Sequence, residues 1–533
     1  MTKIIVAEKI SSSALDVLRE PRWTVVTPDQ LEGKLSAHLD SADALIVRSA
    51  VQVNAALLEH ATRLRVIGRA GVGVDNIDLD AATRKGIAVM NTPGANAVAV
   101  AEHTLGLMLT MARHISRADA LMHAAKWEKK SLQGTELRGK TLGVVGLGRI
   151  GMEVARRARA FGMEIVAHDP FVSPVVAKEQ GIRMVSLDEV YAAADYLTLH
   201  VGLTDQTSGM INPESLKKMK PGVRLVNCAR GELVDEAALV HALKQGRVAA
   251  AALDVFAEEP LKNSPLADME NVILTPHIGG STHEAQAAVG YQIALQVKEY
   301  LKHGVIQNAV NVPSVSHDEY VQMQPYIELA ERLGAFLAQA ANGSLEEVSI
   351  RYSGHIAEWK TELVRNAVIM GILNQALEEK ANLVNAATIA SSRGLRIHEA
   401  HKPKSSGGSG SVLSILLKTG HEERLVKGAV LHGHAPRLLS VDGIDIEAPL
   451  ERNLIFMRNR DVPGVIGRVG TILGEHKINI ADFSLGRRLA NGKSSEPREA
   501  IAVVHVDGRV PDPVLAALRK IPAVEEAKAI RLF

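Results

Sequence analysis

The stretch TLGVVGLGRIGMEVARR (residues 141–157) decides the fold, because it joins an apolar strand pattern, a glycine-rich bend and a helical pattern. Gly146, Gly148 and Gly151 form the G-x-G-x-x-G motif. The first permits a tight turn, the second lets the backbone approach a pyrophosphate, and the third allows the helix to pack closely. Asp169 ends the next strand pattern, where an acid accepts hydrogen bonds from ribose hydroxyls and repels a 2′-phosphate. The stretch therefore predicts a dinucleotide site that binds NAD rather than NADP.

Composition limits the class of protein. A chain of 533 residues is long enough for about three or four domains. Its 61 Lys and Arg residues balance 60 Asp and Glu residues, and aromatic residues make up only 3%, so we expect no nucleic-acid partner. No long apolar segment or signal-peptide pattern stands out, so we expect no membrane association. The single cysteine, Cys228, excludes an internal disulfide framework and suits a reducing cytoplasm, and no metal site is predicted.

Strand patterns before and after the glycine motif predict two parallel sheets. In the first hundred residues KIIVAE, ALIVRS, LRVIGRAG and IAVMNT alternate with helical stretches, which is typical of βαβ units. Six strand patterns follow from residue 141, enough for a complete doubly wound sheet. Polar residues stand at the carboxyl ends of these strands, where open α/β sheets bind their ligands: Asp169, His200, Arg230, Asp254 and His277.

Two helical patterns connect these sheets to the rest of the chain. Residues 96–127 form a long, mostly apolar pattern, which predicts a helix that is buried or lies at an interface. Residues 281–304 predict a helix long enough to leave the nucleotide sheet, and the loop-like VNVPSVSHDE (310–319) marks a boundary after it.

The C-terminal part divides into two regions. Residues 318–445 mix helix and strand signals around HKPKSSGGSG (401–410), a polar tract with the marks of a mobile loop; a structural spacer and a ligand-sensing role stay equally open for this region. Residues 448–533 predict the order βαββαβ, the split βαβ arrangement of ferredoxin-like domains. Such a small sheet often gains core by pairing with a partner, so we expect an oligomer.

Two of the strand-end residues, together with Glu259, form a candidate catalytic group. His277 ends the sixth strand pattern in LTPHIGG, and Glu259 follows the fifth in DVFAEEP, so both can reach one crevice. A carboxylate beside an imidazole fixes its tautomer and stabilises its protonated form, which suits a general acid or base. Arg230 in NCARGELVD adds a planar guanidinium that matches a carboxylate or a polarised carbonyl. Together these groups can support hydride transfer at a carbon that bears a hydroxyl next to a carboxylate.

The motifs GLGRIG, NCARGELVDEAAL, ALDVFAEEP and TPHIGGSTHEAQ resemble those of the D-isomer-specific 2-hydroxyacid dehydrogenase family. IVRSAVQV, VIGRAGVGVDNIDLDAATRKGI and NTPGANAVAVAEHT are similar to the long form of its phosphoglycerate-oxidising branch, and the resemblance covers essentially the whole chain. It implies NAD-dependent oxidation of 3-phospho-D-glycerate to 3-phosphohydroxypyruvate, the first step of L-serine biosynthesis. It also implies a Rossmann-type sheet inserted in a flavodoxin-like α/β substrate domain, then an α+β intervening domain and a ferredoxin-like ACT domain.

The resemblance also implies roles for single residues. Arg230, Glu259 and His277 would be catalytic, with His277 taking the hydroxyl proton as hydride leaves for NAD. The cofactor-lining positions of the family correspond to Gly146, Gly148, Arg149, Ile150, Gly151, Asp169, Val201, Cys228, Ala229, Arg230, Asp254, His277, Ile278, Gly279 and Gly280. The substrate positions correspond to Arg48, Ser49, Arg69 and Asn96, and the alternative for the arginines is an ordinary surface role.

The chain departs from the family pattern at Val72 and at Val201–Gly202. A valine side chain has no hydrogen-bonding group, so Val72 and Val201 can contribute only backbone and apolar contacts to a ligand.

The terminal region resembles an ACT domain, a small-molecule sensor that commonly binds amino acids. Asn459, Asp461 and Asn479 match positions where that family holds serine, and we expect an L-serine effector. Amides and a carboxylate near a helix N-terminus can bind both ends of a zwitterion. Turn and capping chemistry around DVPG explains Asp461 without any ligand, and this alternative stays open.

The expected domains are a substrate domain (1–96 plus 286–315), an NAD-binding domain (97–285), an intervening domain (316–447) and an ACT domain (448–533). Two chain crossings between the first two would make a hinged cleft. Two other functions stay open: reduction of another 2-oxoacid such as 2-oxoglutarate, glyoxylate or hydroxypyruvate, and a non-enzymatic NAD-sensing interaction protein. We expect a homodimer or a homotetramer, and the sequence does not decide between them.

Overall fold

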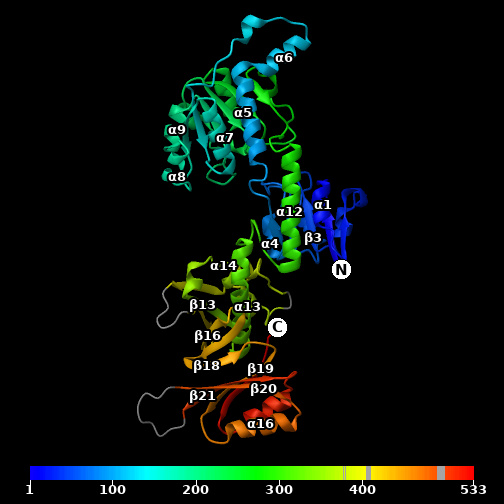
Figure 1. Cartoon of the computed structure of the whole chain (residues 1–533), viewed down its shortest axis with the longest axis vertical. Helices are drawn as coiled ribbons and strands as arrows, with labels where there is room; N and C mark the ends of the chain where they lie inside the picture. The colour runs from blue at the N-terminus through cyan, green and yellow to red at the C-terminus, as the bar shows by residue number, and fades with distance from the viewer. Residues whose placement is uncertain (376, 378–379, 404–409, 489–497, 533) are drawn as a thin grey trace.

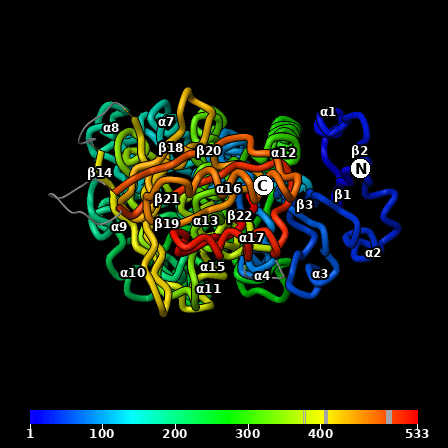
Figure 2. Tube along the Cα trace, turned by 90° about the horizontal axis from the view of Figure 1, so that it is seen from below, coloured from blue at the N-terminus to red at the C-terminus, as the bar shows by residue number. Residues whose placement is uncertain are grey.

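The computed structural model describes residues 1–375, 377, 380–403, 410–488 and 498–532 as an elongated chain of four sheets (Figure 1). The sheet that contains the glycine motif lies at one end of the long axis, and the C-terminal sheet lies at the other. Seen from below, the C-terminal sheet lies in front and the N-terminal segment is displaced to one side (Figure 2). No helix of the described ranges is long and apolar enough to cross a membrane. Among the same residues, no group of three or more His, Cys, Asp or Glu could hold a metal ion.

The first sheet is parallel, with the order β2-β1-β3-β4-β5. Its central strand β3 is apolar and buried along its whole length, as in a sheet covered on both faces. The sequence patterns predict four of these strands and miss the short edge strand β2. The strands are β1 (Thr2–Val6), β2 (Trp23–Val26), β3 (Ala44–Val47), β4 (Val66–Arg69) and β5 (Ala88–Met90). The helices are α1 (Ser12–Val17), α2 (Leu35–Leu39), α3 (Ala55–Glu59) and α4 (Leu79–Arg84), with the 3-10 helix η1 (Pro28–Gln30).

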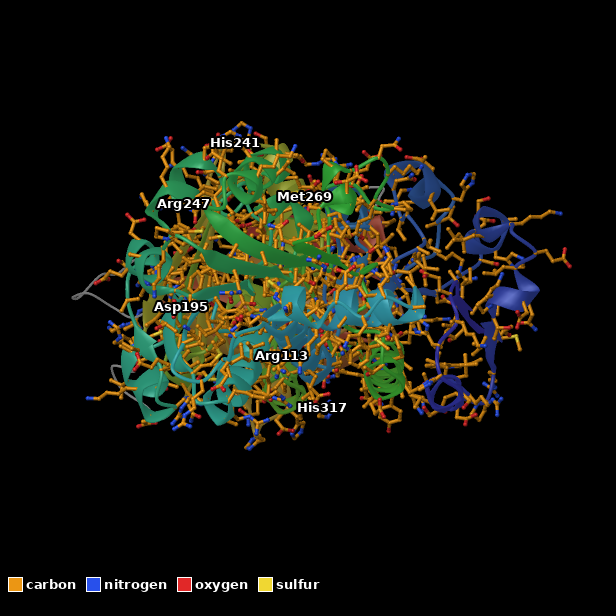
Figure 3. All side chains as sticks on the ribbon, turned by 90° about the horizontal axis from the view of Figure 1, so that it is seen from above. Arg113, Asp195, His241, Arg247, Met269 and His317 are labelled. Carbon is orange, nitrogen blue, oxygen red and sulfur yellow. The ribbon has the colours of Figure 1, made fainter. Side chains whose placement is uncertain are left out.

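The second sheet is also parallel and has the doubly wound order β12-β11-β10-β9-β6-β7-β8. All six predicted strands are present, and a two-residue seventh strand, β8, extends one edge. The strands are β6 (Thr141–Val145), β7 (Glu164–His168), β8 (Arg183–Met184), β9 (Tyr196–Leu199), β10 (Val223–Asn227), β11 (Val248–Leu253) and β12 (Val272–Leu274). The helices are α7 (Arg149–Ala160), α8 (Pro174–Glu179), α9 (Leu187–Ala193), α10 (Pro213–Lys218) and α11 (Glu236–Lys244), with η3 (Gly231–Leu233) and η4 (Pro265–Asp268). Seen from above, Asp195, Arg247 and His241 mark the side of this sheet away from the N-terminal segment (Figure 3).

The long helical pattern of residues 96–127 is two helices, α5 (Ala97–Arg113) and α6 (Ile115–His123), followed by η2 (Lys129–Leu132). His114 separates them with a left-handed backbone (φ +54°). Helix α5 buries its alanine, leucine and methionine side chains against the second sheet, whereas α6 buries none of its residues. The expectation of one continuous helix is therefore wrong, because the pattern does not reveal the break at His114.

Helix α12 (His283–His303) returns the chain to the first sheet. Gly68 in β4 makes room for it, because a Cβ there would lie 2.8 Å from side-chain atoms of Ile293 and Val297. Beyond the helix, Asn91 N–H donates to the carbonyl of Asn308 (3.1 Å). The second sheet is thus inserted within the first part of the chain, and the predicted fold class is confirmed.

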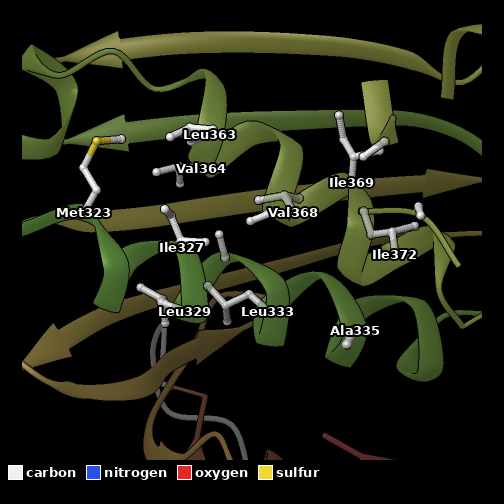
Figure 4. Packing of buried hydrophobic residues seen from close by; sticks show 14 of the residues in the cluster. Met323, Ile327, Leu329, Leu333, Ala335, Leu363, Val364, Val368, Ile369 and Ile372 are labelled. Carbon is white, nitrogen blue, oxygen red and sulfur yellow. The ribbon is translucent and has the colours of Figure 1, made fainter. Parts of the chain in front are cut away.

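The third sheet is mixed, with the order β14-β13-β15-β16-β17-β18, and two packed helices lie against it. Met323, Ile327 and Leu333 of the first helix face Leu363, Val364 and Val368 of the second (Figure 4). Residues 404–409 of the polar tract expected to be a mobile loop lie outside the described residues. The helices are α13 (His317–Ala340), α14 (Glu362–Leu373) and α15 (Ala386–Ser392), with η5 (His355–Glu358). The strands are β13 (Leu345–Ser353), β14 (Arg396–Lys402), β15 (Val412–Thr419), β16 (Glu423–Leu431), β17 (Ala435–Val441) and β18 (Ile444–Pro449).

The fourth sheet has the predicted βαββαβ order, with strands arranged β20-β21-β19-β22. One face of β19 packs against helix α13 of the third sheet. There the Phe456 ring meets Phe336 edge-on, with 5.6 Å between the ring centroids. The other face, with Ile455 and Met457, belongs to the core under α16 and α17. One strand therefore takes part in two cores. The elements are β19 (Asn453–Arg460), α16 (Val465–Glu475), β20 (Ile480–Arg487), β21 (Glu499–Val506), α17 (Asp512–Arg519) and β22 (Val524–Arg531).

A buried arginine joins the third and fourth sheets. Arg424 in β16 is only 4% exposed and pairs with Glu422 (2.9 Å), Asp442 (3.2 Å) and, across the junction, Glu526 of β22 (2.6 Å). Desolvation opposes the charge of Arg424, but its partners, Glu526 first, hold the pKa of the guanidinium above its ordinary value. The three carboxylates keep the buried cation charged and fix the two sheets to each other.

Close packing of α13 on α14 depends on glycine. A Cβ at Gly334 would collide with the carbonyl of Val368, so Gly334→Ala should force the helices apart and lower the free energy of unfolding by about 1–3 kcal/mol. Gly474 in α16 has open space around it, so Gly474→Ala is the matched control and should stabilise by up to about 1 kcal/mol. Urea unfolding of the full chain measures both variants. Equal stability of Gly334→Ala and the unmodified chain would contradict the packing argument.

Candidate active site

The glycine turn follows β6 and opens α7. Gly146 has φ +90°, and a Cβ there would lie 2.5 Å from the carbonyl oxygen of His200. A Cβ at Gly151 would collide with the carbonyl of Gly146, so this glycine is needed for helix packing. Gly148 differs, because a Cβ there meets nothing within 4 Å. The open space at Gly148, beside the helix N-terminus, is where a pyrophosphate can approach the backbone.

Asp169 lies directly beside this turn. Its Oδ2 accepts a hydrogen bond from Leu147 N–H (2.8 Å), and its Oδ1 accepts one from Phe171 N–H (2.8 Å). Each carboxylate oxygen retains a lone pair for a ribose hydroxyl. Arg149 and Ile150 form the first turn of α7, and Arg149 donates to the carbonyl of Pro93, in the first chain crossing between the two sheets.

Hydrogen bonds from the Asn227 side chain to the backbone hold Arg230 at the end of β10. The buried Asn227 donates from Nδ2 to the Arg230 carbonyl (2.7 Å) and accepts from Ala229 N–H (3.0 Å). Burial raises the pKa of the Cys228 thiol to about 12, which excludes a thiolate nucleophile near neutral pH. A Cβ at Gly231 would collide with the Phe256 backbone, so this glycine brings the Arg230 loop against the segment that carries Glu259.

Asp254 organises the loop after β12. It is 1% exposed and accepts hydrogen bonds from Thr275 Oγ1 (2.6 Å), Ile278 N–H (2.9 Å) and Gly279 N–H (2.8 Å). His103 Nε2 in α5 lies 3.3 Å from the same carboxylate. Burial alone would raise the pKa of Asp254, but these donors together hold it below its ordinary value, so the group is an anion at neutral pH.

His277 and Glu259 form a direct pair. His277 Nδ1 lies 2.8 Å from Glu259 Oε2, and Glu259 Oε1 accepts a hydrogen bond from Phe256 N–H (3.1 Å). His277 has a left-handed backbone (φ +54°), a conformation that costs free energy for a non-glycine residue and is concentrated at functional sites. With Nδ1 held by the carboxylate, Nε2 is left to face a substrate.

The end of β9 contributes a neutral histidine. Burial lowers the pKa of His200 to about 3, and its Nε2 lies 3.0 Å from Thr198 Oγ1. The side chain of Val201 lies against Gly146. These residues shape the wall of the glycine turn without adding charge.

The four expected substrate residues belong to the part of the chain that forms the first sheet or directly follows it. Arg48 and Ser49 follow β3, Arg69 ends β4, and Asn96 precedes α5. The buried Nε of Arg69 and Oδ1 of Asn96 have no hydrogen-bond partner in the described part of the chain. Buried polar atoms without partners are costly, so a polar ligand at these two atoms would satisfy them.

One ion pair crosses between the two sheets. Arg230 Nε donates to Asp75 Oδ2 (3.0 Å), and Asp75 is in the loop after β4. Desolvation and the charge of the nearby Arg230 lower the pKa of Arg69 below its ordinary value, whereas Asp75 acts in the opposite sense. Arg69, Asp75 and Arg230 therefore share one electrostatic environment between the two sheets.

A second site lies in the fourth sheet. A pocket of about 280 Å³ opens between the β19–α16 loop and β20, with Asn459, Asp461 and Arg487 among its lining residues. Asn459 is 3% exposed and its Oδ1 has no hydrogen-bond partner among the described residues. Asp461 pairs with Arg487 (3.1 Å). Asn479 does not line this pocket; its Nδ2 donates to Asp507 (2.8 Å).

Sequence reasoning missed several residues that arrange these sites, namely Glu8, Asp75, Asn76, His103, Asn227 and Arg487. Asn227 ends β10, so the strand-end pattern that selected Asp169 could have found it. The others carry no local signal, because their partners are distant in the sequence.

Family models match three consecutive stretches of the chain. The NAD binding domain of D-isomer specific 2-hydroxyacid dehydrogenase matches residues 105–279, the D-3-phosphoglycerate dehydrogenase intervening domain matches 322–442, and the ACT domain matches 453–523. The D-3-phosphoglycerate dehydrogenase of Methanocaldococcus jannaschii is 41% identical over 533 residues, which is all of both chains. That of Bacillus subtilis is 37% identical, again over the full length of both.

The chain belongs to the D-3-phosphoglycerate dehydrogenase branch of the D-isomer specific 2-hydroxyacid dehydrogenase family. It is an NAD-dependent oxidoreductase, so the alternative of a non-enzymatic NAD sensor does not hold.

Two solved structures each resemble more than half of this chain. A protein from Thermus thermophilus is 36% identical, with a TM-score of 0.53, and covers 58% of this chain and 100% of its own. The D-lactate dehydrogenase of Aquifex aeolicus, complexed with NAD and lactic acid, is 30% identical, with a TM-score of 0.52, and covers 59% of this chain and 100% of its own.

Substitutions at two glycines of the motif should distinguish an effect on NAD binding from an effect on folding. Gly148→Ala places a methyl group in open space, so we expect unchanged thermal stability and at least about tenfold weaker NADH binding. Gly151→Ala collides with the Gly146 carbonyl and should lower the melting temperature. NADH fluorescence titration and thermal melts of both variants are the measurement. NADH binding by Gly148→Ala equal to that of the unmodified chain would contradict the role given to the open space.

Proposed function

We propose that the chain oxidises 3-phospho-D-glycerate to 3-phosphohydroxypyruvate with NAD, the first step of L-serine biosynthesis. The observation that carries this proposal is a group of three arginines close enough to act on one another, of which Arg230 lies in a loop packed against the segment that carries Glu259, the partner of His277. Arg48 and Arg69 come from the first sheet, and Arg230 comes from the second. A substrate with a carboxylate at one end and a phosphate at the other needs cations at both ends. Lactate and glyoxylate carry no phosphate, so neither needs the additional cations Arg48 and Arg69.

The proposed roles follow from this geometry. Arg230 binds the substrate carboxylate through guanidinium N–H groups that Asp75 and the Ala229 carbonyl leave free. His277 takes the C2 hydroxyl proton at Nε2, because Nδ1 is held by Glu259. When bound, NAD accepts the hydride that leaves C2. Arg48, Ser49, Arg69 and Asn96 bind the remaining oxygens of the substrate.

The proposed cofactor residues surround the carboxyl ends of β6, β7, β10, β11 and β12. The open space at Gly148, the lone pairs of Asp169 and the ordered loop from His277 to Gly280 fit a dinucleotide. The full proposed set is Gly146, Gly148, Arg149, Ile150, Gly151, Asp169, Val201, Cys228, Ala229, Arg230, Asp254, His277, Ile278, Gly279 and Gly280.

We also propose the division into a substrate domain (1–96 plus 286–315), an NAD-binding domain (97–285), an intervening domain (316–447) and an ACT domain (448–533). The four separate sheets support this division. A cytoplasmic location and a homo-oligomer are part of the same proposal. Ile115, Met122 and Trp127 on and beyond α6 are more than half exposed, which fits a face covered by another copy.

The test of the activity is NADH formation from 3-phosphoglycerate at alkaline pH with the product removed. We expect turnover in the unmodified chain and a loss of at least about 10³-fold in His277→Ala, because the proton acceptor is gone. Arg48→Ala should raise KM for 3-phosphoglycerate and leave turnover of an unphosphorylated 2-oxoacid nearly unchanged. His241→Ala, on α11 and outside the proposed set of site residues, is the matched control. Turnover of glyoxylate or 2-oxoglutarate without turnover of 3-phosphoglycerate would overturn the proposed substrate.

We propose L-serine as an inhibitory effector bound in the pocket of the fourth sheet. Arg487 is placed to bind its carboxylate, and Asn459 Oδ1 and Asp461 are placed to accept from its ammonium group.

Asn459→Ala should abolish serine inhibition and leave kcat without serine within about twofold, because the residue is far from the cleft in sequence and fold. Initial rates over a serine titration measure this effect. Asn479→Ala is the informative comparison, since its side chain pairs with Asp507 instead. An equal loss of inhibition in Asn479→Ala would show that the serine site extends beyond this pocket. Unchanged inhibition in Asn459→Ala would refute the pocket as the site.

A further inference from the structure

The loop of residues 48–51 carries two of the proposed substrate residues and is held by a side chain from another strand end. Glu8 follows β1, which pairs with β3 in parallel, so its carboxylate reaches the loop after β3. Glu8 Oε2 accepts hydrogen bonds from Arg48 N–H (2.7 Å) and Val51 N–H (3.2 Å). Glu8 Oε1 accepts one from Ala50 N–H (3.1 Å). One carboxylate thus binds three of the four backbone N–H groups of the loop.

The carbonyl side of the same loop is held by an amide. Asn76 in the loop after β4 donates from Nδ2 to the carbonyls of Arg48 (2.9 Å) and Val51 (2.7 Å). Five hydrogen bonds from two side chains therefore fix the backbone of a short loop that has no regular secondary structure. Hydrogen bonds of N–H groups to a carboxylate are charge-assisted and stronger than neutral ones.

The hydrogen bonds leave selected groups of the loop free. In the described part of the chain, neither the N–H nor the hydroxyl of Ser49 has a protein partner. The Arg48 guanidinium donates one hydrogen bond, from Nη1 to the Lys9 carbonyl (3.3 Å). The free donors on the loop are thus the ones that an anion such as a phosphate can use.

We propose that Glu8 is a positioning residue for the phosphorylated substrate. It touches no substrate itself; it fixes loop 48–51 so that Ser49 and Arg48 meet the phosphate together. The inference rests on the proposed function, because it takes the phosphate of 3-phosphoglycerate as the ligand of this loop.

The chemistry of Glu8 gives the inference a distinctive test. Three N–H donors need two acceptor oxygens, and glutamine would replace one oxygen with an NH₂ group that faces a donor. Glu8→Gln should therefore behave like Glu8→Ala, with KM for 3-phosphoglycerate raised at least about tenfold, kcat within about threefold and KM for NAD unchanged. Glu8→Asp keeps both oxygens and should recover part of the loss. A carboxylate with a merely structural role would change kcat, both KM values and the melting temperature together.

Matched variants distinguish an effect of releasing loop 48–51 from a general effect of removing a negative charge. Asp16→Asn removes one negative charge from α1 of the same sheet, where Asp16 pairs with the exposed Arg19 (2.9 Å), and should leave all kinetic constants unchanged. Asn76→Ala should reproduce the rise in KM, since it releases the other side of the loop. If Glu8→Gln does not fold, Asn76→Ala alone decides whether the loop must be fixed.

A double-variant cycle provides the decisive measurement. If Glu8 acts through Arg48 and Ser49, the rise in KM from Glu8→Gln combined with Arg48→Ala should be clearly smaller than the product of the two single effects. Fully multiplicative effects would overturn the inference, as would an unchanged KM for 3-phosphoglycerate in Glu8→Gln. The unmodified chain is measured in the same assay. Absence of 3-phosphoglycerate turnover there refutes the proposed function, whereas turnover with an unaffected Glu8→Gln refutes only the inference.

Discussion

The packing of α12 on the first sheet is the interaction on which the cleft depends. Gly68 lets the helix lie close to β4, and Ile293 and Val297 fill the space that a larger residue would occupy. Because the helix returns, the two parallel sheets are joined by two chain crossings instead of one. Arg149 contacts the first crossing at Pro93. The two crossings lie side by side along the chain's path between the sheets, so both must change if the sheets move relative to each other.

Local sequence patterns predicted four of the five strands of the first parallel sheet and six of the seven strands of the second. Strand ends in a parallel sheet share one edge, so the positions of Asp254 and His277 could be inferred without a structure. The contact between His277 and Glu259 required only that two adjacent strands end together. The final βαββαβ unit could be predicted equally well, because each of its elements has its own apolar period.

The parts that could not be predicted depend on partners distant in sequence. Glu8 is an ordinary acid until β1 pairs with β3, and Asp75 acquires its role only when Arg230 approaches from the other sheet. His114 breaks a continuous helical pattern through its own backbone conformation, which no apolar period reveals. Asn479 shows the converse case, since a family motif selected it and the fold pairs it with Asp507.

The two-sided packing of β19 has a consequence for attempts to shorten the chain. Phe456 packs on α13, Lys528 donates to carbonyls at the end of the same helix, and Arg424 finds one of its three carboxylates on β22. A truncated enzyme that ends at residue 447 would expose the apolar side of α13 to water and leave Arg424 with one acid fewer. Such a truncation would therefore disturb the third sheet as well as remove the pocket. Removing the proposed serine site while keeping the scaffold requires substitutions within the pocket of the fourth sheet.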